Sequence, residues 1–163
     1  MRITNTETLI REGRATDRDF VLALADRLVD GFDVPTFRSE AELIEGDRRA
    51  LVAWFDNPSQ PDEAMLIAEH EGQPAGCAFL MTLVDYFNDR PHAHLSVLAV
   101  SKDAEGKGVG SALLDASEQW ARQRGSDRLT LSALVTNKRA RALYERHGFS
   151  GEYIRYVLPL RHP

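Results

Sequence analysis

The amino-acid sequence predicts an α/β domain with a mixed, mostly antiparallel central sheet and helices on both faces. Two patterns predict it. Two apolar runs in the middle of the chain are joined by a short polar turn, and strand-like and helix-like runs alternate in the second half. Strand–helix–strand units pair in parallel through right-handed crossovers. The 163 residues, 43% of them hydrophobic, suffice for one core, so we expect residues 1–163 to form a single domain.

The first third of the chain predicts a strand and two helices. Thr16 precedes a run with apolar residues three or four positions apart, the spacing of one helix face. Thr16 with Asp19 resembles a capping box, and Ser39 with Glu42 forms a better one. The expected elements are a strand at residues 10–14, helices from Thr16 to about residue 31 and from Ser39 to about Trp54, and a loop at residues 57–61.

The middle of the chain predicts three strands. Residues 64–70 and 75–84 are apolar runs separated by the polar turn Glu71–Pro74, which indicates an antiparallel hairpin. Residues 85–91 are rich in loop-forming residues, and residues 92–100 form a further strand-like run.

The last third predicts alternating helices and strands. Gly125 is a natural stop for the helical spacing before it, and Asn137 suits the N-cap of a short basic helix that ends at Gly148. The expected elements are a helix at residues 110–124, a strand at residues 128–134, a helix from Asn137 to Gly148 and a last strand at residues 152–158.

Charge and cysteine content exclude several classes of protein. Lys and Arg number 20 against 25 Asp and Glu, a net charge of −5, which disfavours nucleic acid as a partner. The single cysteine, Cys77, cannot form an internal disulfide or a cysteine-based metal site. The first six residues lack the apolar core of a secretory signal, and the longest apolar runs fall far short of the roughly 20 residues of a membrane span. We therefore expect a cytoplasmic protein that does not insert into membranes.

The segment at residues 97–114 carries the clearest functional pattern, a strand that runs through a glycine-rich turn into a helix. Gly106, Gly108 and Gly110 allow backbone N–H groups to face a ligand, and the helix N-terminus adds a partial positive charge. Together these features suit a pyrophosphate. The spacing fits neither the Walker A loop nor the dinucleotide fingerprint. For the segment taken alone, a glycine-rich connection between a strand and a helix is the alternative explanation.

A second segment makes the pattern specific. Residues 137–149 match Asn-x-x-Ala-x-x-Leu-Tyr-Glu-x-x-Gly-Phe at every defined position, and residues 105–110 are similar to the loop Arg/Gln-x-x-Gly-x-Gly/Ala. With both motifs in this order, the chain resembles the GNAT superfamily of acetyl-CoA-dependent N-acetyltransferases over nearly its whole length. One departure is Glu105, which stands where the family usually has Arg or Gln. The resemblance implies transfer of an acetyl group from acetyl-CoA to a primary amine, by direct attack in a ternary complex.

The resemblance also implies roles for individual residues. Tyr144 matches the family tyrosine that approaches the cofactor sulfur, so we expect it to act as the general acid. Asn137 matches a residue that contacts the cofactor, and it is equally a good N-cap. The other residues expected to bind acetyl-CoA, largely through their backbone, are Leu98, Ala99, Val100, Glu105, Gly106, Lys107, Gly108, Val109, Gly110 and Ser111.

The general base has several candidates. His94, Ser96 and Leu98 are expected to alternate onto one face of the strand that leads into the glycine loop. His94 or Ser96, or a water held by them, is therefore expected near the acceptor, and Glu69 is an alternative. Cys77 is expected in the core, which disfavours a covalent acyl-cysteine route.

The acceptor and the oligomeric state stay open. The resemblance implies a small-molecule or peptide amine and allows a homodimer. A longer acyl-CoA donor, or a cofactor-binding sensor without turnover, are the alternatives. Several aromatic residues are expected either to shape the acceptor site or to pack in the core and loops: Phe32, Phe37, Trp54, Tyr86 and Phe87.

Overall fold

The computed structural model describes residues 8–58 and 60–160. Three parts of the sequence predictions lie outside the described residues: the amino-terminal segment without a secretory signal, residue 59 of the expected loop, and the last three residues of the expected domain. The strands are β1 (Thr8–Glu12), β2 (Glu63–His70), β3 (Gln73–Val84), β4 (Pro91–Val100) and β5 (Leu129–Leu131). The helices are α1 (Arg18–Ala25), α2 (Glu40–Asp56), α3 (Val109–Gln123) and α4 (Lys138–Arg146), with 3-10 turns η1 (Ala15–Asp17) and η2 (Lys102–Ala104).

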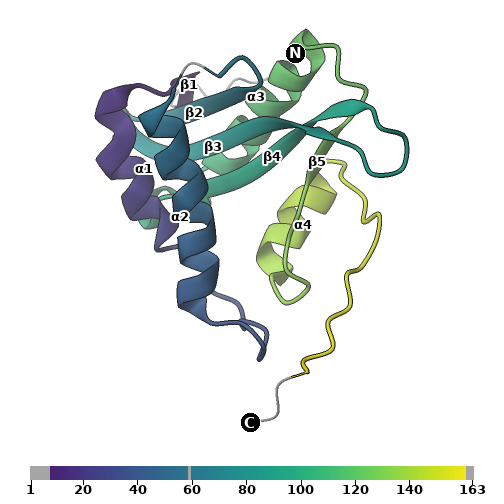
Figure 1. Ribbon diagram of the computed structural model, residues 1–163. Helices are drawn as coiled ribbons and strands as arrows, with labels where there is room; N and C mark the ends of the chain where they lie inside the picture. Colours follow the sequence, from purple (N-terminus) through teal and green to yellow (C-terminus); the bar gives the residue numbers. More distant parts are fainter. Residues whose placement is uncertain (1–7, 59, 161–163) are drawn as a thin grey trace.

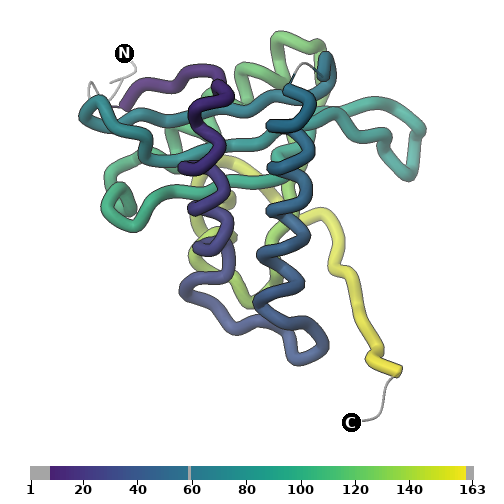
Figure 2. The backbone as a smooth tube through the Cα atoms, turned by 60° about the vertical axis from the view of Figure 1, so that its left-hand side comes forward, coloured from purple at the N-terminus to yellow at the C-terminus, as the bar shows by residue number. Residues whose placement is uncertain are grey.

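The five strands form one sheet in the order β1-β2-β3-β4-β5. The first four pair antiparallel, and β5 pairs parallel with β4. Figures 1 and 2 show α1 and α2 side by side over one face of the sheet. Buried residues of α1 and α2 pack with β2–β4 in one cluster, and α3 and α4 pack with the sheet in a second. The expected mixed, mostly antiparallel sheet with helices on both faces is confirmed.

The helix caps explain where the helices begin. The Ser39 hydroxyl accepts from the Glu42 N–H at 3.1 Å, and the Glu42 carboxylate accepts from the Ser39 N–H at 2.7 Å, so this capping box is confirmed. The expected box at Thr16 is wrong. The Asp17 carboxylate accepts from the Arg14 N–H at 2.7 Å instead, and α1 begins at residue 18.

A membrane-spanning helix needs more length and apolar character than any helix in the described residues has.

The expected last strand at residues 152–158 is not formed. Residues 151–160 belong to no helix or strand, and Figure 1 shows them running away from the sheet beyond α4. Tyr153, Tyr156 and Leu158 are exposed there. Alternating apolar residues favour an extended chain, but a strand forms only with a paired neighbour, which a local pattern does not supply. β5 is also shorter than expected, because it leaves β4 after Leu131.

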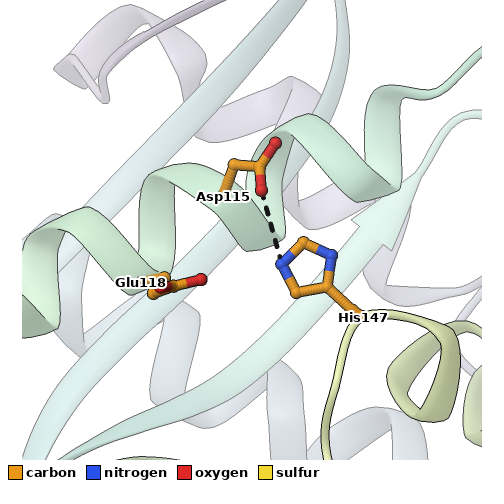
Figure 3. Close-up of side chains that lie close together, drawn as sticks. All are labelled: Asp115, Glu118 and His147. Atoms are coloured by element: carbon orange, nitrogen blue, oxygen red, sulfur yellow. Dashed lines mark ion pairs between the residues drawn. The ribbon is translucent and has the colours of Figure 1, made fainter. Parts of the chain in front are cut away.

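An ion-pair network joins the end of α4 to α3. Figure 3 shows His147 facing Asp115, with Nε2 at 3.4 Å from Oδ1, and Glu118 one turn further along α3. Side-chain ligand atoms of all three lie within 4.8 Å of one another. Arg122 also binds Glu118, with 2.7 Å between Nη2 and Oε1. The carboxylate of Asp115 faces the imidazole of His147, and that of Glu118 faces the guanidinium of Arg122. We therefore interpret the network as a structural contact that holds the end of α4, the helix of Tyr144, against α3.

Candidate active site

A cleft of about 620 Å³ opens where β4 and β5 part. The two strands pair only as far as Leu95 and Leu131, so the following residues of β4 have no β5 neighbour. The chain after β5 instead turns toward α4, and the gap becomes a cleft. Its walls come from β4 and β5, the glycine loop and start of α3, the α1–α2 connection, and one face of α4.

A β-bulge at Ser96 shapes the floor of the cleft. On β3, Phe79 pairs with Val97 and Leu80 pairs with Leu95, so Ser96 has no partner in the register. The extra residue reverses the alternation of β4. Leu95 packs in the α3 cluster, whereas Val97, two residues later, packs in the α1–α2 cluster.

The bulge overturns one expectation from the sequence. His94, Ser96 and Leu98 do not share a face, because strict alternation holds only in an unbulged strand. Leu98 packs against the α3 cluster, on the same side as Leu95, whereas His94 faces the opposite side. Ser96 and Leu98 line the cleft, and His94 is absent from its lining.

The glycine loop leaves the start of α3 open to a ligand. Gly106 and Gly108 adopt positive φ angles of 74° and 81°, which residues with a Cβ rarely adopt. Gly108 is the N-cap of α3, and no side chain of the described residues caps this helix. By contrast, Ser39 caps α2 and Asn137 caps α4. The uncapped N–H groups and the positive end of a 15-residue helix meet the cleft lining, so this end of the cleft suits an anion such as a diphosphate.

Glu105 is neutralised by two arginines. Its carboxylate lies 2.7 Å from Arg27 Nη2 and 3.0 Å from Arg139 Nη1. The hydrogen bond from Arg139, together with the Arg27 contacts, holds the pKa of Glu105 below its usual range. A lone carboxylate would repel a diphosphate, but this carboxylate is shared by two guanidinium groups, one of which also pairs with Asp30, so the corner carries no net negative charge. The departure from the family motif is therefore compatible with an anionic ligand.

Tyr144 lies in the cleft wall on α4. Its ring packs edge-on against Phe149, with 6.0 Å between the ring centroids. Burial raises the pKa of the Tyr144 phenol above its usual value. The phenol therefore keeps its proton at neutral pH and is available as a hydrogen-bond or proton donor. Asn137 also lines the cleft, and its side chain accepts from the Ala140 N–H at 3.1 Å, so its capping role is confirmed.

His94 lies on the paired part of β4, one residue before Leu95, where β4 and β5 part. Its Nδ1 is 2.8 Å from Thr130 Oγ1, and Nε2 of His92 approaches the same oxygen at 3.0 Å. Burial, and to a lesser extent repulsion from His92, lowers the pKa of His94 below its usual value. The imidazole is therefore neutral at pH 7, the form in which it can accept a proton.

The remaining candidates from the sequence divide into residues that line the cleft and residues that lie elsewhere. Burial raises the pKa of the Cys77 thiol to about 12, so it supplies no thiolate at neutral pH. Glu69 accepts from Arg11 at 2.6 Å and does not line the cleft. Of the aromatic residues, Phe32 lines the cleft and Trp54 packs in the core. The others are exposed: Phe37, Tyr86 and Phe87.

Two cleft residues were missed from the sequence. Arg27 lies in the turn that follows α1 and reaches the glycine loop, a long-range contact with no local signal. Asp47 lies on α2 and lines the cleft. The sequence does contain a sign of it, because Asp47 stands at a helix position where the spacing of the apolar residues predicts another apolar residue.

Comparisons with known proteins agree with this geometry. Residues 28–149 match the model of the Acetyltransferase (GNAT) family. An uncharacterized N-acetyltransferase, YhfO of Bacillus subtilis, is 28% identical over 151 residues, 91% of this chain and 95% of its own. The mycothiol acetyltransferase of Propionibacterium freudenreichii is 38% identical over 97 residues, 60% of this chain. The matched part is 29% of that relative, so the chain spans less than a third of its length.

Solved structures share the fold. A putative acetyl transferase from Pyrococcus furiosus superposes with a TM-score of 0.70 at 24% identity, covering 94% of this chain and 100% of its own. An aminoglycoside N-acetyltransferase solved in complex with CoA gives a TM-score of 0.68 at 18% identity, covering 94% of this chain and 95% of its own. Since the family model spans well over half of the sequence, the chain belongs to the acetyltransferase (GNAT) family, which uses acetyl-CoA as its acyl donor.

Proposed function

We propose that this single domain transfers the acetyl group of acetyl-CoA directly to a primary amine, with both substrates bound at once. The observation that carries the proposal is the cleft itself. The unpaired edge of β4 leads into the uncapped start of α3, and a protonated Tyr144 faces the same space. An unpaired strand edge suits the amide-bearing arm of CoA, and an uncapped helix start suits its diphosphate.

The residues present fit each part of the donor. Backbone N–H groups from residues 108–111 would hold the diphosphate, and the backbone of residues 98–100 would pair with the pantetheine arm. Arg146 also lines the cleft and adds positive charge for the phosphates. The backbone N–H of Ser96, which has no partner in the register with β3, would polarise the thioester carbonyl.

The chemistry requires one proton to be removed and one to be supplied. An alkyl ammonium has a pKa near 10.4, so the acceptor must lose a proton before its nitrogen can attack. The nitrogen then bonds to the acetyl carbon, the carbon–sulfur bond breaks, and the sulfur leaves with the electron pair. Tyr144 is assigned to protonate that sulfur. His94 is assigned to remove the ammonium proton, through the Ser96 hydroxyl or a water at the bulge.

A substitution of His94 checks this assignment. We expect His94→Asn to lower kcat roughly 10- to 100-fold, with the KM for acetyl-CoA unchanged. Because the pKa of His94 is lowered, the wild-type rate should fall only below about pH 6.5, as the imidazole becomes protonated. The variant should lack that acid limb. Retention of the same limb in the pH–rate profile would remove His94 from the mechanism.

Release of free CoA thiol from acetyl-CoA tests the proposed function. The acceptors would be 2-phenylethylamine, spermidine, glucosamine, an aminoglycoside and a lysine peptide, a set that spans the small-molecule and peptide classes. We expect at least one amine to increase thiol release, with acetyl-CoA preferred over longer acyl donors. CoA binding without any amine-dependent release would favour a sensor. Sedimentation of the same preparation tests the homodimer that the family resemblance allows.

A further inference from the structure

Asp47 interrupts the apolar stripe of α2. Residues three and four positions apart share one helix face, so Asp47 lies between Leu43 and Leu51 on the same stripe. Trp54 continues that stripe one turn later. Leu51 and Trp54 are buried against the sheet, with exposed fractions of 0% and 6%. An acid at a core-facing position breaks an otherwise consistent helix pattern, and such breaks concentrate at functional sites.

The carboxylate of Asp47 has no hydrogen-bond or ion-pair partner among the described residues. The adjacent cation, Arg48, points toward α1, where Nη1 lies 3.3 Å from the Leu22 carbonyl oxygen and 3.9 Å from Asp26 Oδ1. The side chain of Asp47 is half-buried, and burial alone raises its pKa. A partly desolvated carboxylate without a cation is unfavourable, so the fold gains nothing from an acid at this position.

The other acids of the cleft are already paired. Arg27 binds Glu105 at 2.7 Å and Asp30 at 3.3 Å. Among the described lining residues, Asp47 is therefore the carboxylate that is left for a ligand. The lining residues around it, from the α1–α2 side, are apolar: Leu28, Val29, Phe32 and Leu43.

We infer that Asp47 binds the ammonium group of the acceptor, and that the acceptor carries an apolar or aromatic body beside its amine. The carboxylate supplies the counter-charge that an ammonium needs on leaving water, and the surrounding Leu, Val and Phe side chains contact the carbon skeleton. This inference rests on the proposed function, because it names the acceptor of that same reaction.

The charge pattern of the cleft separates the two substrates. Arg27 and Arg139 meet at Glu105 beside the start of α3, and Arg146 lines the cleft from α4, so these cations suit the phosphates of the donor. The unpaired carboxylate of Asp47 comes from a different element, α2. Electrostatic complementarity of this kind orients ligands and rejects the reverse arrangement.

Two variants of α2 test the role of Asp47. Asp47→Asn keeps the shape and removes the charge, and Glu45→Gln removes the same charge from an exposed position of the same helix. For the amines that the wild type acetylates, we expect D47N to raise the amine KM roughly 10- to 100-fold, the loss typical of a hydrogen bond to a charged group. The Kd for CoA, from calorimetry, should be unchanged, and E45Q should match the wild type. We also expect 2-phenylethylamine to have a lower KM than glucosamine.

A third variant separates binding from folding. Asp47→Leu restores the apolar stripe, so we expect a higher Tm together with the same loss of acceptor binding. An unchanged amine KM in D47N would overturn the inference, as would equal effects of D47N and E45Q, or a weaker Kd for CoA in D47N. If the wild type acetylates none of the amines, the proposed function fails, and this inference fails with it. Acetylation by the wild type with an unaffected D47N refutes the inference alone.

Discussion

Gly108→Val is expected to weaken CoA binding at least 10- to 100-fold. Gly108 has a φ of 81° and caps α3 without a side chain. A β-branched residue is strongly disfavoured there, at about 1–2 kcal/mol or more, so the loop must change its backbone conformation. That change turns away the N–H groups that we assign to the diphosphate. Isothermal titration calorimetry with CoA measures the effect.

Gly125→Val is the matched control. Gly125 has a φ of 70°, follows the other end of the same helix, and has open space around the position of a Cβ. The Gly125→Val substitution therefore imposes similar backbone strain, but far from the cleft. We expect it to lower thermal stability but to leave the Kd for CoA unchanged. Equal losses of CoA binding in both variants would mean that the loop acts only through stability.

Tyr144→Phe is expected to lower kcat about 10²- to 10⁴-fold at neutral pH, the usual contribution of general acid catalysis. Burial raises the pKa of the Tyr144 phenol, so the phenol carries its proton throughout the neutral range. Phenylalanine keeps the ring and its contact with Phe149, and therefore the cleft wall. The Kd for CoA should be unchanged, because the proton is needed only as the sulfur leaves. Steady-state thiol release over pH 6–9 measures the effect.

Tyr156→Phe controls for the loss of a phenol as such, since Tyr156 is exposed in the segment after α4. Its kcat should equal that of the wild type. If Tyr144→Phe retains the wild-type kcat across the pH range, the departing thiolate needs no acid from α4, and solvent protonates it. A large loss of CoA affinity in the same variant would instead identify Tyr144 as a binding residue.

Most of the fold was predictable because its signals are local. The capping side chains of Ser39 and Asn137 mark the starts of α2 and α4, and the turn between residues 71 and 74 marks the β2–β3 hairpin. The last strand was predicted wrongly, since residues 152–158 have the alternation of a strand but no partner. Strand formation depends on a neighbouring edge, which no local pattern reveals.

The site was predictable where the sequence carries a motif. Gly106, Gly108 and Tyr144 come together in the cleft as the two motifs suggested. The bulge at Ser96 was not predictable, because it is visible only in the pairing register of β3 with β4. The neutralisation of Glu105 depends on Arg27, which lies 78 residues away in sequence. Such long-range ion pairs leave no trace in spacing or composition.

A crystal structure of the protein with CoA tests the central claim most directly, that the cleft between β4 and β5 holds the donor for amine acetylation. We predict diphosphate oxygens within hydrogen-bonding distance of the N–H groups of residues 108–111, the pantetheine arm along residues 98–100, and the sulfur beside the Tyr144 hydroxyl. CoA bound elsewhere, for example in the smaller cavity lined by His147 and Phe149, or a sulfur remote from Tyr144, would contradict the account.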